Sequence, residues 1–261
     1  LHITTNGSLP DRVRDFARRF EAPRRLHVMV SFDGLAETHD ANRGRGAPFR
    51  NAYETVRRLA RLRDERGLGV SVGHTVISPA SMTDAQPLQQ VLGKLDVDVQ
   101  TVLAYADSAM YGQDRQGACS PDLIGAAYPL HEALDPRRAA DFVAVELRRS
   151  RRLRSPALRR GRRYYLRGLS NRLRPNPRPQ PRPGCVALRS HVRLLPDANV
   201  PVCQFNTATV GNLHEQDLDA VWHGPRAAAQ RAWVDACPGC WAGCEVIPNA
   251  LYTADLLRPI G

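Results

Sequence analysis

The arrangement of cysteines is the feature that most limits how this 261-residue chain can fold. Five of its six cysteines lie within the last 77 residues. Two thiolates three residues apart on a turn can face one metal ion or cluster, and two more thiolates from a hairpin would complete a four-sulfur site. We therefore predict a metal centre in the carboxyl-terminal part, with its ligands among Cys185, Cys203, Cys237, Cys240 and Cys244.

Disulfide bonds or inert buried thiols are the alternative interpretation of this pattern. No apolar signal segment precedes the chain, and no window reaches the length of a membrane-spanning helix, so we expect a reducing, cytoplasmic location and no membrane partner. Dense cysteines in such a compartment favour metal ligation. Cys119 lies far from the others in sequence and is interpreted as a structural thiol. The spacing alone does not separate zinc from an iron-sulfur cluster.

The residues around the cysteines indicate a small, irregular domain. The stretch from Arg193 to Cys203, RLLPDANVPVC, contains a polar turn between apolar residues and predicts a hairpin with Cys203 on its return strand. Leu218, Val221 and Trp222 have the spacing of one helical face. A second short helix is expected before the last cysteines.

These segments together resemble the SPASM or twitch extension of radical S-adenosylmethionine (radical SAM) enzymes. The resemblance rests on Cys185 and on the strings LLPDANVPVC, VGNLHEQDLDAVW and CPGCWAGCE. It implies one auxiliary [4Fe-4S] cluster with Cys185, Cys203, Cys237 and Cys240 as ligands, and Cys244 as a substitute or a ligand to another group. Two features depart from the family pattern. Ala198 stands where the family usually has glycine, and the cysteine run is shorter than a two-cluster domain requires.

The amino-terminal half alternates between strand and helix patterns, as in a parallel α/β barrel. Four apolar or alternating segments predict strands: 1–5, 26–32, 68–77 and 97–105. Apolar residues at helical spacing follow the first three strands, and Asp135-Pro136 predicts the cap and first turn of a further helix. The fold class is therefore α/β: an incomplete parallel (β/α)6 barrel of the radical SAM type with a small cysteine-rich hairpin and helix domain.

Polar residues at the carboxyl ends of two predicted strands are the candidate cofactor-binding residues, because parallel α/β folds bind ligands there. The segments ITTNG and VSFDG, the latter followed by HDANRG, resemble the radical SAM barrel. This resemblance implies that Ser31 and Asp33 lie near bound S-adenosylmethionine, and it extends to Asn6 and Arg43. The alternative is ordinary turn chemistry, since Asn-Gly and Asp-Gly end strands in many proteins.

Two motifs of the radical SAM family do not occur in this sequence. They are the CxxxCxxC loop, which holds the cluster that cleaves S-adenosylmethionine, and the Gly-Gly-Glu segment. The chain also begins at Leu1, within what would be the third strand. We expect a truncated enzyme with strands 3–6 in residues 1–149, a linker in 150–183, and the SPASM or twitch domain in 184–261. This polypeptide alone is not expected to perform radical chemistry.

The formal net charge of +11 comes from one segment. Residues 148–184 hold 14 arginines and no acidic residue, while the remainder has 23 basic and 26 acidic residues. One interpretation is a solvated linker, in which Leu158, Tyr165, Leu169 and Leu173 form the packed side of a helix and the prolines after residue 174 form an extended tether. The other is a binding site for an anionic partner.

The function implied by the resemblance is that of the carboxyl-terminal portion of a radical SAM enzyme. The complete enzyme would abstract hydrogen from a peptide, protein or other natural-product substrate and take electrons from a donor such as a flavodoxin or ferredoxin. The alternative is a zinc-ribbon or iron-sulfur protein that binds nucleic acid through the arginine-rich segment without catalysis. No general acid or base can be named. His39, His74 and His191 are interpreted as polar or packing residues.

Overall fold

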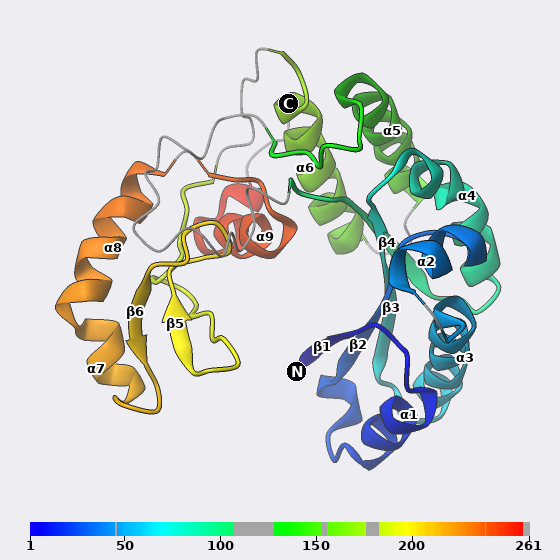
Figure 1. The fold of residues 1–261 in the computed structure, drawn as a ribbon, viewed down its shortest axis with the longest axis horizontal. Coiled ribbons are helices and arrows are strands. Elements are labelled where there is room, and N and C mark those ends of the chain that lie inside the picture. Colours follow the sequence, from blue (N-terminus) through cyan, green and yellow to red (C-terminus); the bar gives the residue numbers. More distant parts are fainter. Residues whose placement is uncertain (45, 107–127, 153–155, 176–182, 238, 258–261) are drawn as a thin grey trace. The chain divides into compact units, whose positions relative to one another are not determined.

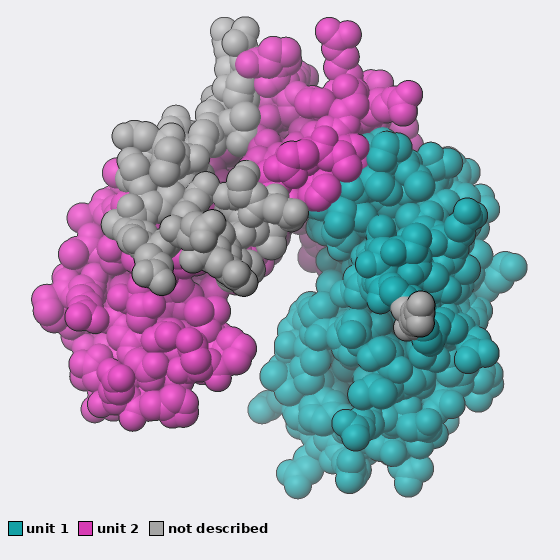
Figure 2. All heavy atoms as spheres, in the orientation of Figure 1, with its two compact units in different colours: residues 1–104 teal, residues 105–261 magenta. Residues whose placement is uncertain are grey.

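The computed structural model describes all residues except 45, 107–127, 153–155, 176–182, 238 and 258–261. The chain divides into two compact units, residues 1–104 and 105–261 (Figure 2). The domain boundaries expected after residues 149 and 183 stay predictions. Cys119 and most of the proline tether lie outside the described residues. Among the described helices, none is both long and apolar enough to cross a bilayer.

A four-stranded parallel sheet forms the centre of unit 1. Its strands are adjacent in chain order: β1 (His2–Thr5), β2 (His27–Phe32), β3 (Gly69–Val76) and β4 (Asp98–Leu103). The register pairs His2 with His27 and His27 with Gly69, so the amino ends of the first three strands are aligned. All four predicted strands are confirmed, and sequential parallel pairing is the arrangement found in the wall of a barrel.

Four helices connect these strands: α1 (Pro10–Arg19), α2 (Ala36–Arg43), α3 (Pro48–Arg66) and α4 (Pro79–Gly93). Helix α3 packs on β2 and β3, α4 packs on β3 and β4, and α1 packs on α3. Local sequence sets the ends of these helices. Ser78 and Ser81 form a capping box at the start of α4, and Gly67 ends α3 with φ = 78°, a conformation that glycine adopts without a Cβ clash.

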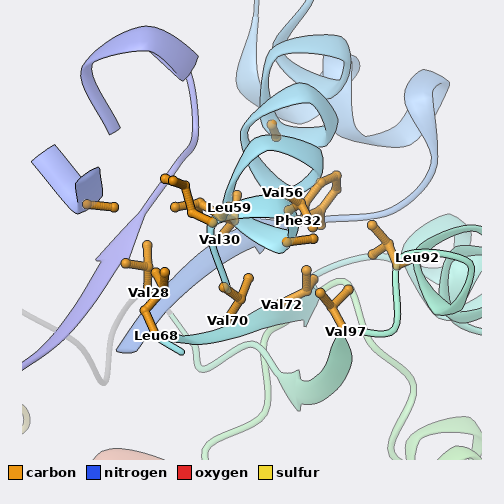
Figure 3. Packing of buried hydrophobic residues seen from close by; sticks show 14 of the residues in the cluster. Val28, Val30, Phe32, Val56, Leu59, Leu68, Val70, Val72, Leu92 and Val97 are labelled. Carbon is orange, nitrogen blue, oxygen red and sulfur yellow. The ribbon is translucent and has the colours of Figure 1, made fainter. Parts of the chain in front are cut away.

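The core of unit 1 lies between the sheet and these helices (Figure 3). Val28, Val30 and Phe32 of β2 contribute their side chains to it, and each is at most 1% exposed. Side chains alternate between the two faces of a strand, so Met29 and Ser31 lie on the opposite face of β2. That alternation places Ser31, one of the candidate cofactor residues, on the face of the sheet away from the apolar core.

The described residues of unit 2 form helices α5 and α6, followed by a cysteine-rich part (Figure 1). The helices are α5 (Pro136–Arg149), which continues into a short 3-10 turn, η4 (Ser150–Arg152), and α6 (Pro156–Arg172). Helix α6 packs against α5 and α9. The cysteine-rich part consists of β5 (Asn199–Pro201), β6 (Thr209–Asn212), α7 (Leu218–His223), α8 (Pro225–Ala236), α9 (Gly243–Tyr252) and a final turn, η5 (Asp255–Leu257).

Some local predictions for unit 2 are confirmed, and others are wrong. Asp135 caps α5 as predicted, since its Oδ1 accepts a hydrogen bond of 2.8 Å from the Arg138 N–H. Within the helix predicted to carry four packed apolar residues, Tyr165 and Leu169 are buried, but Leu158 is 53% exposed. The predicted hairpin is also shifted. Strand β5 pairs with β6 rather than with the residues before it, so Cys203 lies in the loop between the two strands and not on a strand.

The turn before β5 contains an alanine in a left-handed conformation. Ala198 has φ = 63°, and its backbone is held by hydrogen bonds with Leu195 and Leu213 of 2.9 Å each. A Cβ in this region costs about 1–2 kcal/mol, while glycine adds an unfolded-state entropy cost of about 0.5–1 kcal/mol. We expect Ala198→Gly to raise the free energy of unfolding by about 0.5 kcal/mol in urea denaturation. The matched control Ala228→Gly, at an exposed position within α8, is expected to lower it by about 1 kcal/mol. A loss of stability in Ala198→Gly would contradict the prediction.

Candidate metal centre

Four of the five clustered cysteines line one pocket. Cys185 precedes the hairpin, Cys203 lies in the β5–β6 loop, and Cys237 and Cys240 lie between α8 and α9. Cys203 and Cys240 are buried, whereas Cys185 and Cys237 are half-buried. Three separate segments of the chain therefore bring their thiols to the same place.

A backbone N–H donates to each of these four thiols. The donor is Asn206 for Cys203 (3.3 Å), Gly239 for Cys237 (3.4 Å) and Ala242 for Cys240 (3.4 Å), and Ala187 supplies the corresponding bond to Cys185. Every donor is two or three residues after its cysteine, so each bond closes a tight local turn. Such N–H groups stabilise a thiolate and are one way in which proteins tune cluster potentials.

Burial is the main influence on the acidity of these thiols. It raises the pKa of Cys185 to about 11 and of Cys203 to about 12, although the backbone N–H groups act in the opposite direction. It also raises the pKa of Cys240 well above its ordinary value. These cysteines are thus neutral thiols at pH 7 until a cation displaces their protons, which is the usual linkage between metal binding and thiol ionisation.

The donor set suits a four-sulfur metal site, although the pocket is narrow. The cavity has a volume of about 20 Å³, which is room for roughly one water molecule. In the described part of the chain, no three His, Cys, Asp or Glu side chains are already arranged as ligands around a single ion. Binding of a cluster would therefore require the four thiol side chains to move into positions around it. The fit therefore rests on donor chemistry and on the shared pocket.

Cys244 has a different environment from the other four. It lies in the first turn of α9, where its thiol donates to Gln204 Oε1 at 3.2 Å and lies 3.7 Å from Arg193 Nη2. It is exposed and does not belong to the pocket lining. The structure thus separates Cys244 from the four cysteines with which it was grouped by sequence.

A buried carboxylate lies beside the four thiols. Glu245 is 3% exposed and lines the pocket. Its Oε1 accepts from Arg193 Nη2 at 2.7 Å, and its Oε2 lies 3.0 Å from His191 Nε2. Burial alone would raise the pKa of Glu245, but the hydrogen bonds from His191 and Arg193 lower it. The sequence contained no signal for this group, because the partners are more than 50 residues from Glu245.

Loss of the Arg193 guanidinium, which pairs with Glu245, is expected to destabilise the fold. Arg193→Leu would leave the Glu245 carboxylate buried with one of its two partners, and we expect the free energy of unfolding to fall by about 2–3 kcal/mol in urea denaturation at pH 7. In the double variant Arg193→Leu/Glu245→Leu no unpaired charge remains, so at least half of the loss should be recovered. A double variant as unstable as the sum of the two single variants would contradict this account.

Three of the four candidate cofactor residues, Asn6, Ser31 and Asp33, lie at the carboxyl ends of β1 and β2, and the fourth, Arg43, is the last residue of α2. Asp33 and Arg43 contact each other through two hydrogen bonds of 2.7 Å, from Arg43 Nε to Oδ2 and from Nη2 to Oδ1. Asn6 uses its Oδ1 to accept from the Ser8 N–H at 3.0 Å, as in an ordinary turn. Ser31 is paired with Gly73 of β3. The structure therefore brings Asp33 and Arg43 into direct contact. The positions of Asn6 and Ser31 follow from strands β1 and β2, respectively.

His39, interpreted from the sequence as a polar or packing residue, holds the backbone that follows β2. His39 is fully buried between Phe32 and Phe49, with ring centroids 5.3 and 6.0 Å away. Its Nδ1 accepts the Asp33 N–H at 3.0 Å, so the ring proton is assigned to Nε2, which has no hydrogen-bond partner among the described residues. Burial lowers the pKa of His39. A neutral His39 thus positions the backbone of Asp33.

Comparison with protein families assigns the cysteine-rich part. Residues 185–241 match the family model named SPASM, an iron-sulfur cluster-binding domain. The predicted resemblance to this domain is confirmed. All four cysteines of the pocket lie inside the match, and Cys244 lies beyond it. No curated protein matches the chain.

Comparison with solved structures supports the fold of most of the chain. "Native anSMEcpe with bound AdoMet" has a TM-score of 0.52 at 15% identity, over 87% of this chain and 57% of that chain. "Native anSMEcpe with bound AdoMet and Cp18Cys peptide" has a TM-score of 0.53 at 14% identity, over 87% and 58%. The chain therefore spans less than two thirds of the structures that it matches. Its fold is an anSME-like partial barrel with a SPASM region, which confirms the predicted fold class.

Proposed function

We propose that this chain is the carboxyl-terminal portion of a radical SAM enzyme and holds one auxiliary [4Fe-4S] cluster. The proposed ligands are Cys185, Cys203, Cys237 and Cys240. The observation that carries this proposal is the shared pocket, in which each of the four thiols also receives a backbone N–H. A cluster with four cysteine ligands has no open iron, so its chemistry would be electron transfer rather than substrate ligation.

The residues of the pocket would contribute to cluster binding in three ways. The four thiols lose their protons when they become ligands. The backbone N–H groups then stabilise the negatively charged sulfurs. Phe205 and Trp241, which are 5% and 3% exposed, line the pocket and exclude water from it. Burial of this kind also influences the reduction potential.

The cofactor residues of the complete enzyme are proposed at the strand ends. Asn6, Ser31, Asp33 and Arg43 would contact S-adenosylmethionine, with Arg43 orienting the Asp33 carboxylate. The position of the first three at the carboxyl ends of β1 and β2 supports this, because ligands bind at that end of parallel barrels. The bound AdoMet named for the structure with the same fold agrees with it.

The substrate class proposed for the complete enzyme is a peptide. Two matched structures are named for bound Kp18Cys and Cp18Cys peptides, which supports this choice over a small molecule. We also propose that the complete enzyme abstracts hydrogen from this peptide. A flavodoxin or ferredoxin in the cytoplasm would supply the electrons.

Metal analysis of the full chain tests the cluster. After anaerobic reconstitution with iron and sulfide, we expect brown protein with about four irons and four sulfides per chain. Zinc must be measured in the same samples before and after reconstitution. Colourless protein that binds zinc and takes up no iron would overturn the proposal and favour the zinc-ribbon alternative.

The coding DNA upstream of Leu1 tests the enzymatic part of the proposal. About 100 codons would encode two further strand-helix units. An in-frame CxxxCxxC motif and a Gly-Gly-Glu segment there would support a radical enzyme. A stop codon in that stretch would withdraw the catalytic part of the proposal and leave the cluster-binding part unaffected.

A further inference from the structure

The arginine-rich segment divides into two groups in the structure. One group faces the interior and has structural partners. Arg149 and Arg162 lie 3.0 and 3.6 Å from the two carboxylate oxygens of Glu146. Arg172 donates to the Gly239 carbonyl at 2.8 Å and lies 5.0 Å from the centre of the Trp241 ring. These arginines join α6 to α5 and to the loop between α8 and α9, which explains their presence without any ligand.

The second group lies along the other side of α6. Arg159, Arg163 and Arg167 are spaced by four residues and therefore share one side of the helix. At about 100° per residue, that side is opposite the one that carries the buried residues Gly168 and Arg172. Arg151 of η4 joins the group, because its carbonyl accepts from Arg159 Nη1 at 3.5 Å. We call Arg151, Arg159, Arg163 and Arg167 the arginine stripe.

Positive charges gather in the arginine stripe at an energetic cost. Burial lowers the pKa of Arg163, and repulsion by Arg167, Arg151 and Arg159 lowers it further. None of the carboxylates in the described parts of the chain forms an ion pair with Arg151, Arg159 or Arg163. Like charges four residues apart destabilise a helix. Arg151, Arg159 and Arg163 therefore gather positive charge without a carboxylate partner among the described residues, unlike the inward arginines, and an anion from outside would reduce this repulsion.

We propose that the arginine stripe binds an acidic segment of the peptide substrate. This inference rests on the proposed function, because it assigns the recognition of that peptide to α6. Successive arginines of the stripe are about 6 Å apart along the helix axis. Alternate side chains of an extended peptide are about 6.6–6.8 Å apart. Three acidic residues at alternate positions would thus face Arg159, Arg163 and Arg167 in turn, and the guanidinium fork can bind each carboxylate through two hydrogen bonds.

Single-stranded nucleic acid fits the stripe less well than an acidic peptide does. Proteins that bind single strands usually add exposed aromatic rings on which the bases stack. The two tyrosines of α6 are buried instead, Tyr164 at 0% and Tyr165 at 4% exposure. No other aromatic residue occurs in α6. The stripe thus supplies charge without a stacking surface.

Binding of a synthetic peptide to the full chain tests the proposal. The probe is an extended nine-residue peptide with glutamate at alternate positions, compared with the same peptide carrying glutamine. The test variant is Arg159→Gln/Arg163→Gln/Arg167→Gln. The control Arg12→Gln/Arg18→Gln/Arg61→Gln removes the same charge from exposed positions of unit 1. We expect the acidic peptide alone to bind, the stripe variant to weaken binding about 10-fold or more, and the control to change it less than 2-fold.

Three results would overturn the proposal. They are equal binding of the two peptides, equal weakening by both triple variants, and tighter binding of a uridine oligonucleotide of matched charge in 0.15 M salt, which would favour RNA as the partner. Circular dichroism should show that the stripe variant keeps its helices, because it removes repulsion. Iron content of the same samples separates this test from that of the proposed function. If the chain binds the acidic peptide but never takes up iron, the proposal for the arginine stripe stands and the proposal for the cluster is refuted.

Discussion

Cys203→Ala and Cys240→Ala are expected to abolish binding of the iron-sulfur cluster, whereas Cys244→Ala should leave it at the level of the unsubstituted chain. Cys203 and Cys240 line the buried pocket, and each has a backbone N–H directed at its sulfur. Cys244 is exposed and donates to Gln204 instead. Iron and sulfide per chain after anaerobic reconstitution is the measurement, and Cys244→Ala is the matched control.

The outcome also decides which four cysteines are ligands. Full iron content in Cys203→Ala, or loss of iron in Cys244→Ala with retention in Cys237→Ala, would refute the proposed ligand set. Thermal unfolding of each metal-free variant should accompany the analysis, so that loss of iron is not confused with loss of the fold. The substitution to alanine removes only a sulfur atom, and we expect the metal-free variants to remain folded.

Gly168→Ala is expected to lower the free energy of unfolding by about 2–3 kcal/mol. A Cβ at this position of α6 would overlap the indole ring of Trp241. The ring has little freedom to move, because Trp241 is 3% exposed, donates from Nε1 to the Tyr165 carbonyl at 2.9 Å, and stacks on Tyr164 with centroids 5.7 Å apart. Overpacking of this kind typically costs 1–3 kcal/mol, with larger losses at rigid sites.

A second glycine on the same helix provides the control. Nothing lies within 4 Å of the Cβ position at Gly161. Gly161→Ala should therefore stabilise the chain by about 0.5–1 kcal/mol through the higher helix propensity of alanine. Urea denaturation followed by circular dichroism measures both variants. Equal effects of the two substitutions would show that the contact with Trp241 does not limit this position.

Local sequence patterns were sufficient for the strands of unit 1 and for helices α1, α3 and α4, whereas helix α2 was not predicted. The strands β1–β4 were predicted because apolar alternation and strand-ending turns are properties of a few neighbouring residues, and side-chain direction follows directly from them. The same holds for the Asp135 cap of α5. The shifted hairpin shows the limit of such patterns. A turn at residues 195–198 does form, but the partner of β5 is β6, and pairing between strands depends on packing beyond the turn.

The sequence predicted a cysteine-rich centre because thiol spacing is itself a chemical signal, and it predicted the α/β class because periodicity is local. The family resemblance implied the ligand set of four cysteines, and only the tertiary structure showed that these thiols line one pocket while Cys244 is directed toward Gln204 and Arg193. The same is true of Glu245, whose partners are more than 50 residues away, and of the division of the arginines into inward and outward groups. In each case, the packing of the chain decides which side chains are buried and which remain exposed. A buried charge or thiol must find a partner wherever packing brings one, and the distance along the chain does not restrict that choice.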